Sequence, residues 1–149
     1  MRVVDANVLI HAVNLDSSEH ATARAWLEER LSGTEAVGFA WVALLAFVRI
    51  VTRPHVLAVP LAPVHAFDYL EEWLEQPAAT LVEPTRRHVA VLRGLLEPLG
   101  TAGNLTSDAH LAALAVEHGA QLVSFDRDFG RFPGLRWCHP ADDLATAIS

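Results

Sequence analysis

Short apolar runs in this chain alternate with longer stretches in which apolar residues recur at helical spacing. The runs predict strands at residues 2–6, 36–40, 80–82 and 121–125, with a last edge strand at 136–138. The longer stretches predict helices at residues 8–12, 17–31, 41–52, 63–74, 86–96, 106–118 and 142–148. Because strands alternate with helices, the pattern predicts an α/β fold, a three-layer sandwich in which helices flank a mostly parallel central sheet of four to five strands.

Local signals refine several of these helices. Asp16 and Glu19 have the spacing of a capping box, which predicts the start of the second helix. Thr85 is the predicted cap of the helix that follows it. Side chains on the apolar helix faces are predicted to pack in the core, among them Trp26, Trp41, Phe67, Trp73 and Val89.

Length and composition limit the class of protein. The chain has 149 residues, about the size of one domain, and no linker or repeat divides it, so we expect a single domain over residues 1–149. Apolar residues make up 52% of it, but the longest apolar run, 36–48, is too short to span a membrane. Cys138 is the only cysteine and has no partner for an internal disulfide. These features predict a cytoplasmic protein.

The charge composition excludes some chemistry. All 11 basic residues are arginine, so the chain has neither the lysine of a P-loop nor one for Schiff-base catalysis. The formal net charge of −7 also disfavours broad, unassisted binding to nucleic acid, which depends on basic groups that displace counterions. Any nucleic acid must therefore be bound by a few well-placed basic groups rather than by the overall charge of the protein.

Acidic residues lie where the predicted parallel sheet would present a ligand. Asp5 ends the first strand, Asp126 and Asp128 follow the strand at 121–125, and Asp108 lies in the first turn of a predicted helix. Carboxylates gathered at one edge repel one another unless a cation neutralises them. Oxygen ligands suit Mg²⁺ or Mn²⁺, and such a site is suited to phosphodiester hydrolysis.

Each acidic residue also has a purely structural interpretation. Asp5 can begin a turn, and Asp108 can simply favour the positive end of its helix. The segment 126–128 can be an ordinary turn after a strand. Considered together, their common position at one predicted edge favours a metal site.

Three blocks of the sequence resemble the motifs of PIN-domain nucleases. They are DANVLI at 5–10, GNLTSDAHLAALAVEHGA at 103–120, and LVSFDRDFGRFPGLRW at 122–137. Together they resemble the VapC-type toxins of bacterial toxin–antitoxin pairs, especially an actinobacterial subgroup. The resemblance implies a PIN-like fold and a Mg²⁺- or Mn²⁺-dependent endoribonuclease. It also implies a homodimer that a VapB-like antitoxin holds inactive.

The resemblance also suggests roles for individual residues. It places Asp5, Asp108 and Asp126 at the metal, with Asp128 as an auxiliary carboxylate. Asn7 and Ser124 are then expected to orient these ligands through hydrogen bonds. Arg127 and Arg131 are candidates to hold RNA phosphates, and the equal alternative is that they only screen the carboxylates.

One position departs from the pattern. Most PIN nucleases carry a glutamate in the helix after the second strand, where this chain has Ala46. The missing charge predicts weaker metal binding and a single well-held cation. It also supports the alternative that the chain is a PIN-fold binding module with little or no catalysis. The eight histidines lack zinc-site spacing, and His110 is expected to point away from Asp108.

Overall fold

Five short strands form a single parallel sheet in the computed structural model, which describes residues 1–147. Within these residues the strand order is β3-β2-β1-β4-β5, and every neighbouring pair is parallel. The strands are β1 (Arg2–Val4), β2 (Val37–Phe39), β3 (Ala79–Leu81), β4 (Gln121–Val123) and β5 (Trp137–Cys138). The predicted α/β sheet of up to five strands is therefore confirmed, and it is fully parallel.

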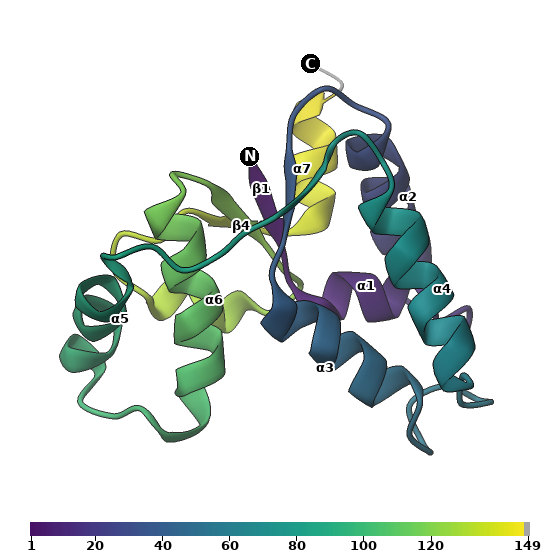
Figure 1. Ribbon diagram of the computed structural model, residues 1–149, viewed down its shortest axis with the longest axis horizontal. Coiled ribbons are helices and arrows are strands. Elements are labelled where there is room, and N and C mark those ends of the chain that lie inside the picture. The colour runs from purple at the N-terminus through teal and green to yellow at the C-terminus, as the bar shows by residue number, and fades with distance from the viewer. Residues whose placement is uncertain (148–149) are drawn as a thin grey trace.

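Helices cover both faces of the sheet, as Figure 1 shows. They are α1 (Ala6–Val13), α2 (His20–Leu31), α3 (Trp41–Val51), α4 (Pro63–Leu74), α5 (His88–Leu96), α6 (Thr106–Glu117) and α7 (Pro140–Ala147). Two buried clusters fill the space between the layers. One cluster packs the four helices α1, α2, α3 and α4 against Val4, Val37 and Val123 of the sheet. The other packs α5 and α6 against Val3 and Leu122. Alternate residues of a strand thus face opposite cores, as in a three-layer sandwich.

The buried helix faces differ from the predicted ones at three positions. Trp26 and Trp73 are buried as predicted, but Trp41 is 45% exposed. Phe67 and Val89 are also exposed, at 48% and 73%. Their helices do have apolar residues at helical spacing, yet neighbouring elements cover only part of each apolar stripe. Periodicity within one helix does not show how far that coverage extends.

Four helix starts also differ from the predicted ones. The first helix, α1, begins two residues earlier, at Ala6, and α5 begins two residues later, at His88, with Arg87 rather than Thr85 at its N-cap position. The predicted capping box does not form, because α2 begins at His20 and Glu19 makes no side-chain cap. Instead, the backbone N–H of Glu19 donates to Ser17 Oγ at 3.1 Å. The last helix was expected at 142–148 and begins earlier, at Pro140, because proline fits the first turn, which needs no N–H donor. Residues 148 and 149 lie outside the described part of the chain.

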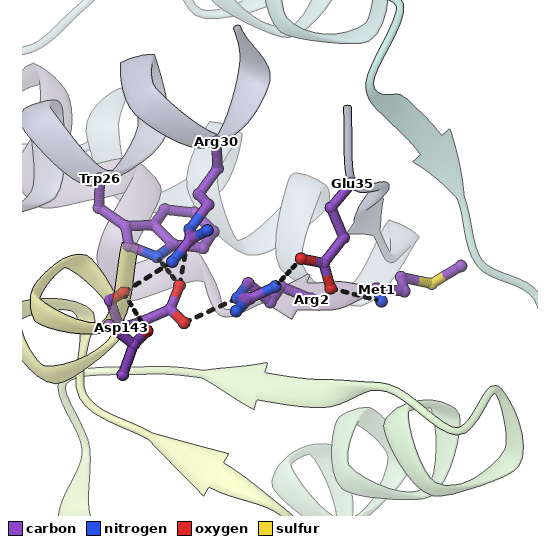
Figure 2. Close-up of polar contacts among 7 residues, drawn as sticks. Met1, Arg2, Trp26, Arg30, Glu35 and Asp143 are labelled. Carbon is purple, nitrogen blue, oxygen red and sulfur yellow. Dashed lines mark hydrogen bonds and ion pairs between the residues drawn. The ribbon is translucent and has the colours of Figure 1, made fainter. Parts of the chain in front are cut away.

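A buried carboxylate, Asp143, joins α7 to β1 and α2 (Figure 2). Its side chain accepts hydrogen bonds from Arg2 Nε at 2.7 Å and from Trp26 Nε1 at 2.8 Å. Arg30 Nε lies 2.8 Å from Asp143 Oδ2, and Arg30 Nη2 donates to the Asp143 carbonyl at 2.6 Å. Arg2 also pairs with the exposed Glu35. This network fixes the end of the chain against the first strand.

Within residues 1–147, none of the helices combines the length and apolar character that crossing a membrane requires.

Candidate active site

The first and fourth strands bring two aspartates to the same edge of the sheet. β1 and β4 are parallel neighbours in which Val4 pairs with Val123, so their carboxyl ends meet. Asp5 follows β1, and its backbone N–H donates to the carbonyl of Val123 at 3.0 Å. Asp126 comes three residues after the end of β4. Asp108 reaches this edge from the first turn of α6.

Asp5 has a local structural role as well. It is the N-cap of α1, and its Oδ1 accepts the backbone N–H of Ala6 at 2.7 Å. An N-cap carboxylate stabilises the positive end of a helix. The cap holds the side chain at the end of the strand, because Asp5 itself has extended backbone geometry while the next residue is helical.

Ser124 connects the polar residues of this edge. Its buried hydroxyl donates to Asp5 Oδ2 at 2.7 Å and accepts from Asn7 Nδ2 at 2.9 Å. It also accepts the backbone N–H of Asp126 at 3.0 Å. Asn7 Oδ1 in turn accepts the N–H of Phe125 at 3.2 Å. All the hydrogen-bonding capacity of the hydroxyl is therefore used, and Asp5 is held in one orientation.

Burial and neighbouring negative charges raise the pKa of two of these carboxyls, Asp5 and Asp108. Burial raises the pKa of the Asp5 carboxyl from its ordinary 3.8 to about 6, against the hydrogen bonds from Ser124 and Ala6. The negative charges of Asp108 and Asp126 raise it further. Burial and the nearby Asp126 and Asp128 likewise raise the pKa of Asp108, whereas Arg131 lowers it. An uncompensated negative charge at this edge is thus costly.

The donor set suits a hard cation, although it does not form a closed cage. Asp5, Asp108 and Asp126 offer only oxygen atoms, which Mg²⁺ and Mn²⁺ prefer. In the described part of the chain, no three acidic, histidine or cysteine side chains are grouped closely enough to hold an ion among themselves. Mg²⁺ is usually bound through one or two carboxylates and keeps several waters, so this open arrangement fits such an ion.

The segment after β4 forms a short 3₁₀ turn, Arg127–Arg131. Asp126 Oδ1 caps it by accepting the backbone N–H of Asp128 at 2.9 Å. Asp128 is exposed and pairs with Arg131, whose Nη2 lies 3.1 Å from Oδ2. Arg127 is exposed, and its guanidinium forms no ion pair with a carboxylate within residues 1–147. The segment is therefore a turn, as its structural interpretation predicted. Arg131 already neutralises the carboxylate of Asp128.

A cavity of about 490 Å³ opens beside two of the carboxylates. Asp5, Asn7 and Asp108 line it, together with residues of α3 that include Ala46 and Arg49. Asp126 and Asp128 are not part of its lining. Ala46, which stands where most PIN nucleases carry a glutamate, therefore lines the cavity beside Asp5 and Asp108.

A second polar cluster, which no sequence pattern predicted, lies between α5 and α6. His88 Nδ1 lies 2.5 Å from Glu117 Oε2, and His88 Nε2 lies 2.9 Å from His110 Nδ1. Thr85 donates to Glu117 Oε1 through its hydroxyl and its backbone N–H. Although burial would raise the pKa of Glu117, these hydrogen bonds lower it. The hydrogen bonds of this cluster connect residues 22 to 32 positions apart in the sequence, and they fix α5 against α6.

Comparisons with known proteins agree with this fold. The PIN domain family matches residues 2–135. Ribonuclease VapC37 of Mycobacterium tuberculosis is 52% identical over 140 residues, covering 94% of this chain and 97% of that protein. Ribonuclease VapC33 of the same species is 41% identical over 140 residues, covering 94% of this chain and 98% of that protein.

A solved structure shows the same fold at low sequence identity. It is the crystal structure of VapBC2 from Rickettsia felis bound to a DNA fragment from their promoter, with a TM-score of 0.69 and 18% identity. The match covers 93% of this chain and 97% of that one. With the family match and the identity to the VapC ribonucleases, it follows that this chain belongs to the PIN domain family, among its VapC-type ribonucleases.

Proposed function

We propose that this protein is a metal-dependent endoribonuclease that acts as the toxin of a toxin–antitoxin pair. The observation that carries the proposal is the convergence of Asp5, Asp108 and Asp126 at the carboxyl edge of the sheet, where the charges of Asp108 and Asp126 raise the pKa of Asp5 and the charge of Asp126 raises the pKa of Asp108. Ligands of parallel α/β sheets bind at this edge. The identity to VapC ribonucleases supports hydrolysis of RNA.

The chain's own residues supply three parts of the chemistry. Asp5 and Asp108 offer carboxylate oxygens to the cation, and Ser124 and Asn7 hold Asp5 in place. Mg²⁺ or Mn²⁺ would contribute a water of lowered pKa and would neutralise charge on the scissile phosphate. Arg127, which has no carboxylate partner among residues 1–147, can bind an RNA phosphate directly, whereas Arg131 first has to leave Asp128.

The partners follow from the same relatives. Structures similar to this chain are complexes of VapB and VapC proteins, so we propose a VapB-like antitoxin as its partner. We further propose that the chain is a single domain that forms a homodimer in the cytoplasm. The net charge of −7 suits a basic antitoxin segment, and it makes RNA binding dependent on the cation and on local arginines.

The direct test compares RNA cleavage by the wild-type protein with cleavage by Asp108→Asn. Purified protein is incubated with structured RNA and Mn²⁺ or Mg²⁺, and EDTA serves as the metal-free control. We expect the substitution to reduce the rate about a hundredfold or more, the scale seen when a group that stabilises charge in the transition state is removed. Asp142→Asn, which changes an exposed aspartate on α7, is the matched control. Equal cleavage by all three proteins would contradict the site.

The structure gives two reasons to keep the binding-module alternative in the test. No three metal-binding side chains are already grouped closely within residues 1–147, and the cavity wall has Ala46 in place of an acid. A binding module would show no metal-dependent cleavage by the wild-type protein. A nuclease would show cleavage that disappears both in EDTA and in the Asp108→Asn variant.

A further inference from the structure

The cavity beside Asp5 and Asp108 has an apolar part that metal binding does not require. Its volume is about 490 Å³, within the range of about 300–1,000 Å³ typical of small-molecule sites. Its aliphatic lining comes from three helices: Ile10 of α1, Leu111 of α6, and Val42, Leu45, Ala46 and Ile50 of α3. An apolar wall gives nothing to a metal ion, so it points to a ligand with an apolar surface.

Arg49 is the one basic residue that lines this cavity within the described chain. It lies in the last turn of α3 and is exposed. Its guanidinium makes no ion pair or hydrogen bond within residues 1–147, although arginines elsewhere, such as Arg2 and Arg30, are paired with carboxylates. An unpaired guanidinium at the edge of an apolar cavity is ready to bind an anion bidentately.

A nucleotide of single-stranded RNA matches both features. Its base has two flat apolar faces, and its phosphate carries the negative charge. Sequence-specific proteins recognise RNA mostly through such unstacked bases, which they remove from water and contact at the edges. Ser107, whose exposed hydroxyl lines the same cavity, offers a polar group for a base edge.

We propose that the cavity between α1, α3 and α6 is a nucleotide subsite, in which one unstacked base packs against Ile10, Ala46 and Ile50 while Arg49 binds its phosphate. The inference rests on the proposed ribonuclease function, because it places this nucleotide next to the scissile phosphate at Asp5 and Asp108. It assigns part of the substrate selection to α3. The small side chain of Ala46 leaves room for the base.

The isoleucines of the chain make a direct test available. There are three, and two of them, Ile10 and Ile50, line the cavity. Selective ¹³C labelling of the isoleucine δ1 methyl groups therefore gives very few NMR signals, which Ile10→Val and Ile50→Val assign. The probes are the four nucleoside 5′-monophosphates, and ribose 5-phosphate is the control that lacks a base. None of these contains an internucleotide bond that the protein could cleave.

We expect at least one nucleoside monophosphate to shift the methyl signals of Ile10 and Ile50, and ribose 5-phosphate to leave them in place. Arg49→Gln should weaken that binding about tenfold or more, the effect of losing a charge-assisted hydrogen bond of about 1.5–3 kcal/mol. Arg53→Gln is the matched control, because Arg53 is exposed and does not line the cavity. Ala46→Phe should fill the cavity and abolish the shifts caused by the base.

Three results would overturn the subsite. In one, nucleotides and ribose 5-phosphate affect the two methyl groups equally. In another, Arg49→Gln binds nucleotides as tightly as Arg53→Gln does. In the third, N-acetyl-leucinamide, a mimic of a protein side chain, shifts the methyl signals while nucleotides do not, which would make the cavity a docking site for protein.

The RNA cleavage assay separates this inference from the function on which it rests. If the wild-type protein cleaves RNA but no nucleotide shifts the methyl signals, the nuclease assignment holds and the subsite is wrong. If nucleotides shift the signals but RNA is not cleaved in any metal, the cavity binds nucleotides and the nuclease assignment fails.

Discussion

Replacing Asp5 with asparagine should stabilise the metal-free protein and, at the same time, abolish RNA cleavage. The carboxyl of Asp5 is held among other acidic groups, and burial is the main reason that its pKa is raised to about 6. Ionising it in the folded protein is therefore costly. Asparagine keeps the shape of the side chain and removes the charge, but it is a poorer ligand for a cation.

The size of the effect follows from the pKa. In the unfolded chain the carboxyl titrates near 3.8, and in the folded protein near 6. At about 1.4 kcal/mol for each pH unit between these values, ionisation destabilises the folded state by about 3 kcal/mol above pH 6. Asparagine also loses one of the two hydrogen bonds from Ser124 and Ala6, which costs about 1 kcal/mol. A net gain of about 2 kcal/mol remains.

The dependence on pH has a definite sign. Because the folded pKa is raised, wild-type Asp5 carries no penalty below the unfolded pKa, and the penalty grows as pH rises from about 4 to about 6. The variant should therefore be more stable than wild type at about pH 7.5, and that advantage should disappear at about pH 4. Urea unfolding in EDTA at the two pH values measures the difference.

Two comparisons make this assay decisive. Asp16→Asn changes an exposed aspartate outside the candidate site and should alter stability by less than about 0.5 kcal/mol. Adding Mn²⁺ should stabilise wild type but not Asp5→Asn, since only a protein that binds the ion gains from it. A stability difference between variant and wild type that is the same at both pH values would refute the reasoning.

Three further predictions concern packing and the site. Asp143→Asn should lower the free energy of unfolding by about 3–5 kcal/mol, measured in urea, because it leaves the partly buried Arg2 and Arg30 without their buried carboxylate; Asp142→Asn should not. Ala46→Glu should tighten Mn²⁺ binding in calorimetry by adding a carboxylate to the cavity of Asp5, and an unchanged isotherm would argue against that placement. Gly38→Ala should cost about 1–3 kcal/mol in thermal unfolding, since its Cβ would lie 3.0 Å from Val82 Cγ1; full stability would show that the sheet yields there.

Much of the fold and the placement of the candidate site could be predicted from local sequence patterns. Apolar runs and helical spacing located the five strands and seven α-helices of residues 1–147 to within a few residues. Asp5 and Asp126 could be placed after strands, and Asp108 in a first helical turn, because each position depends only on its own element. The missing acid at Ala46 was also visible in the sequence.

Other features depend on which elements become neighbours. That β1 lies between β2 and β4 brings Asp5 within 2.7 Å of Ser124, a residue 119 positions away in the chain. Trp41 was wrongly predicted to be buried for the same kind of reason, since its exposure depends on which helices cover α3. The hydrogen bonds of Asp143 with Arg2 and Trp26 join segments more than 100 residues apart.

The sequence by itself therefore determined the elements, their order and the residue types at their ends. Only the tertiary structure decided which apolar stripes are covered, which charges are buried, and that Arg49 and Ile50 share a cavity with Asp5. The physical reason is that periodicity and capping act over a few residues within one element. Burial, pKa and cavity shape are set by contacts between elements, which no local pattern encodes.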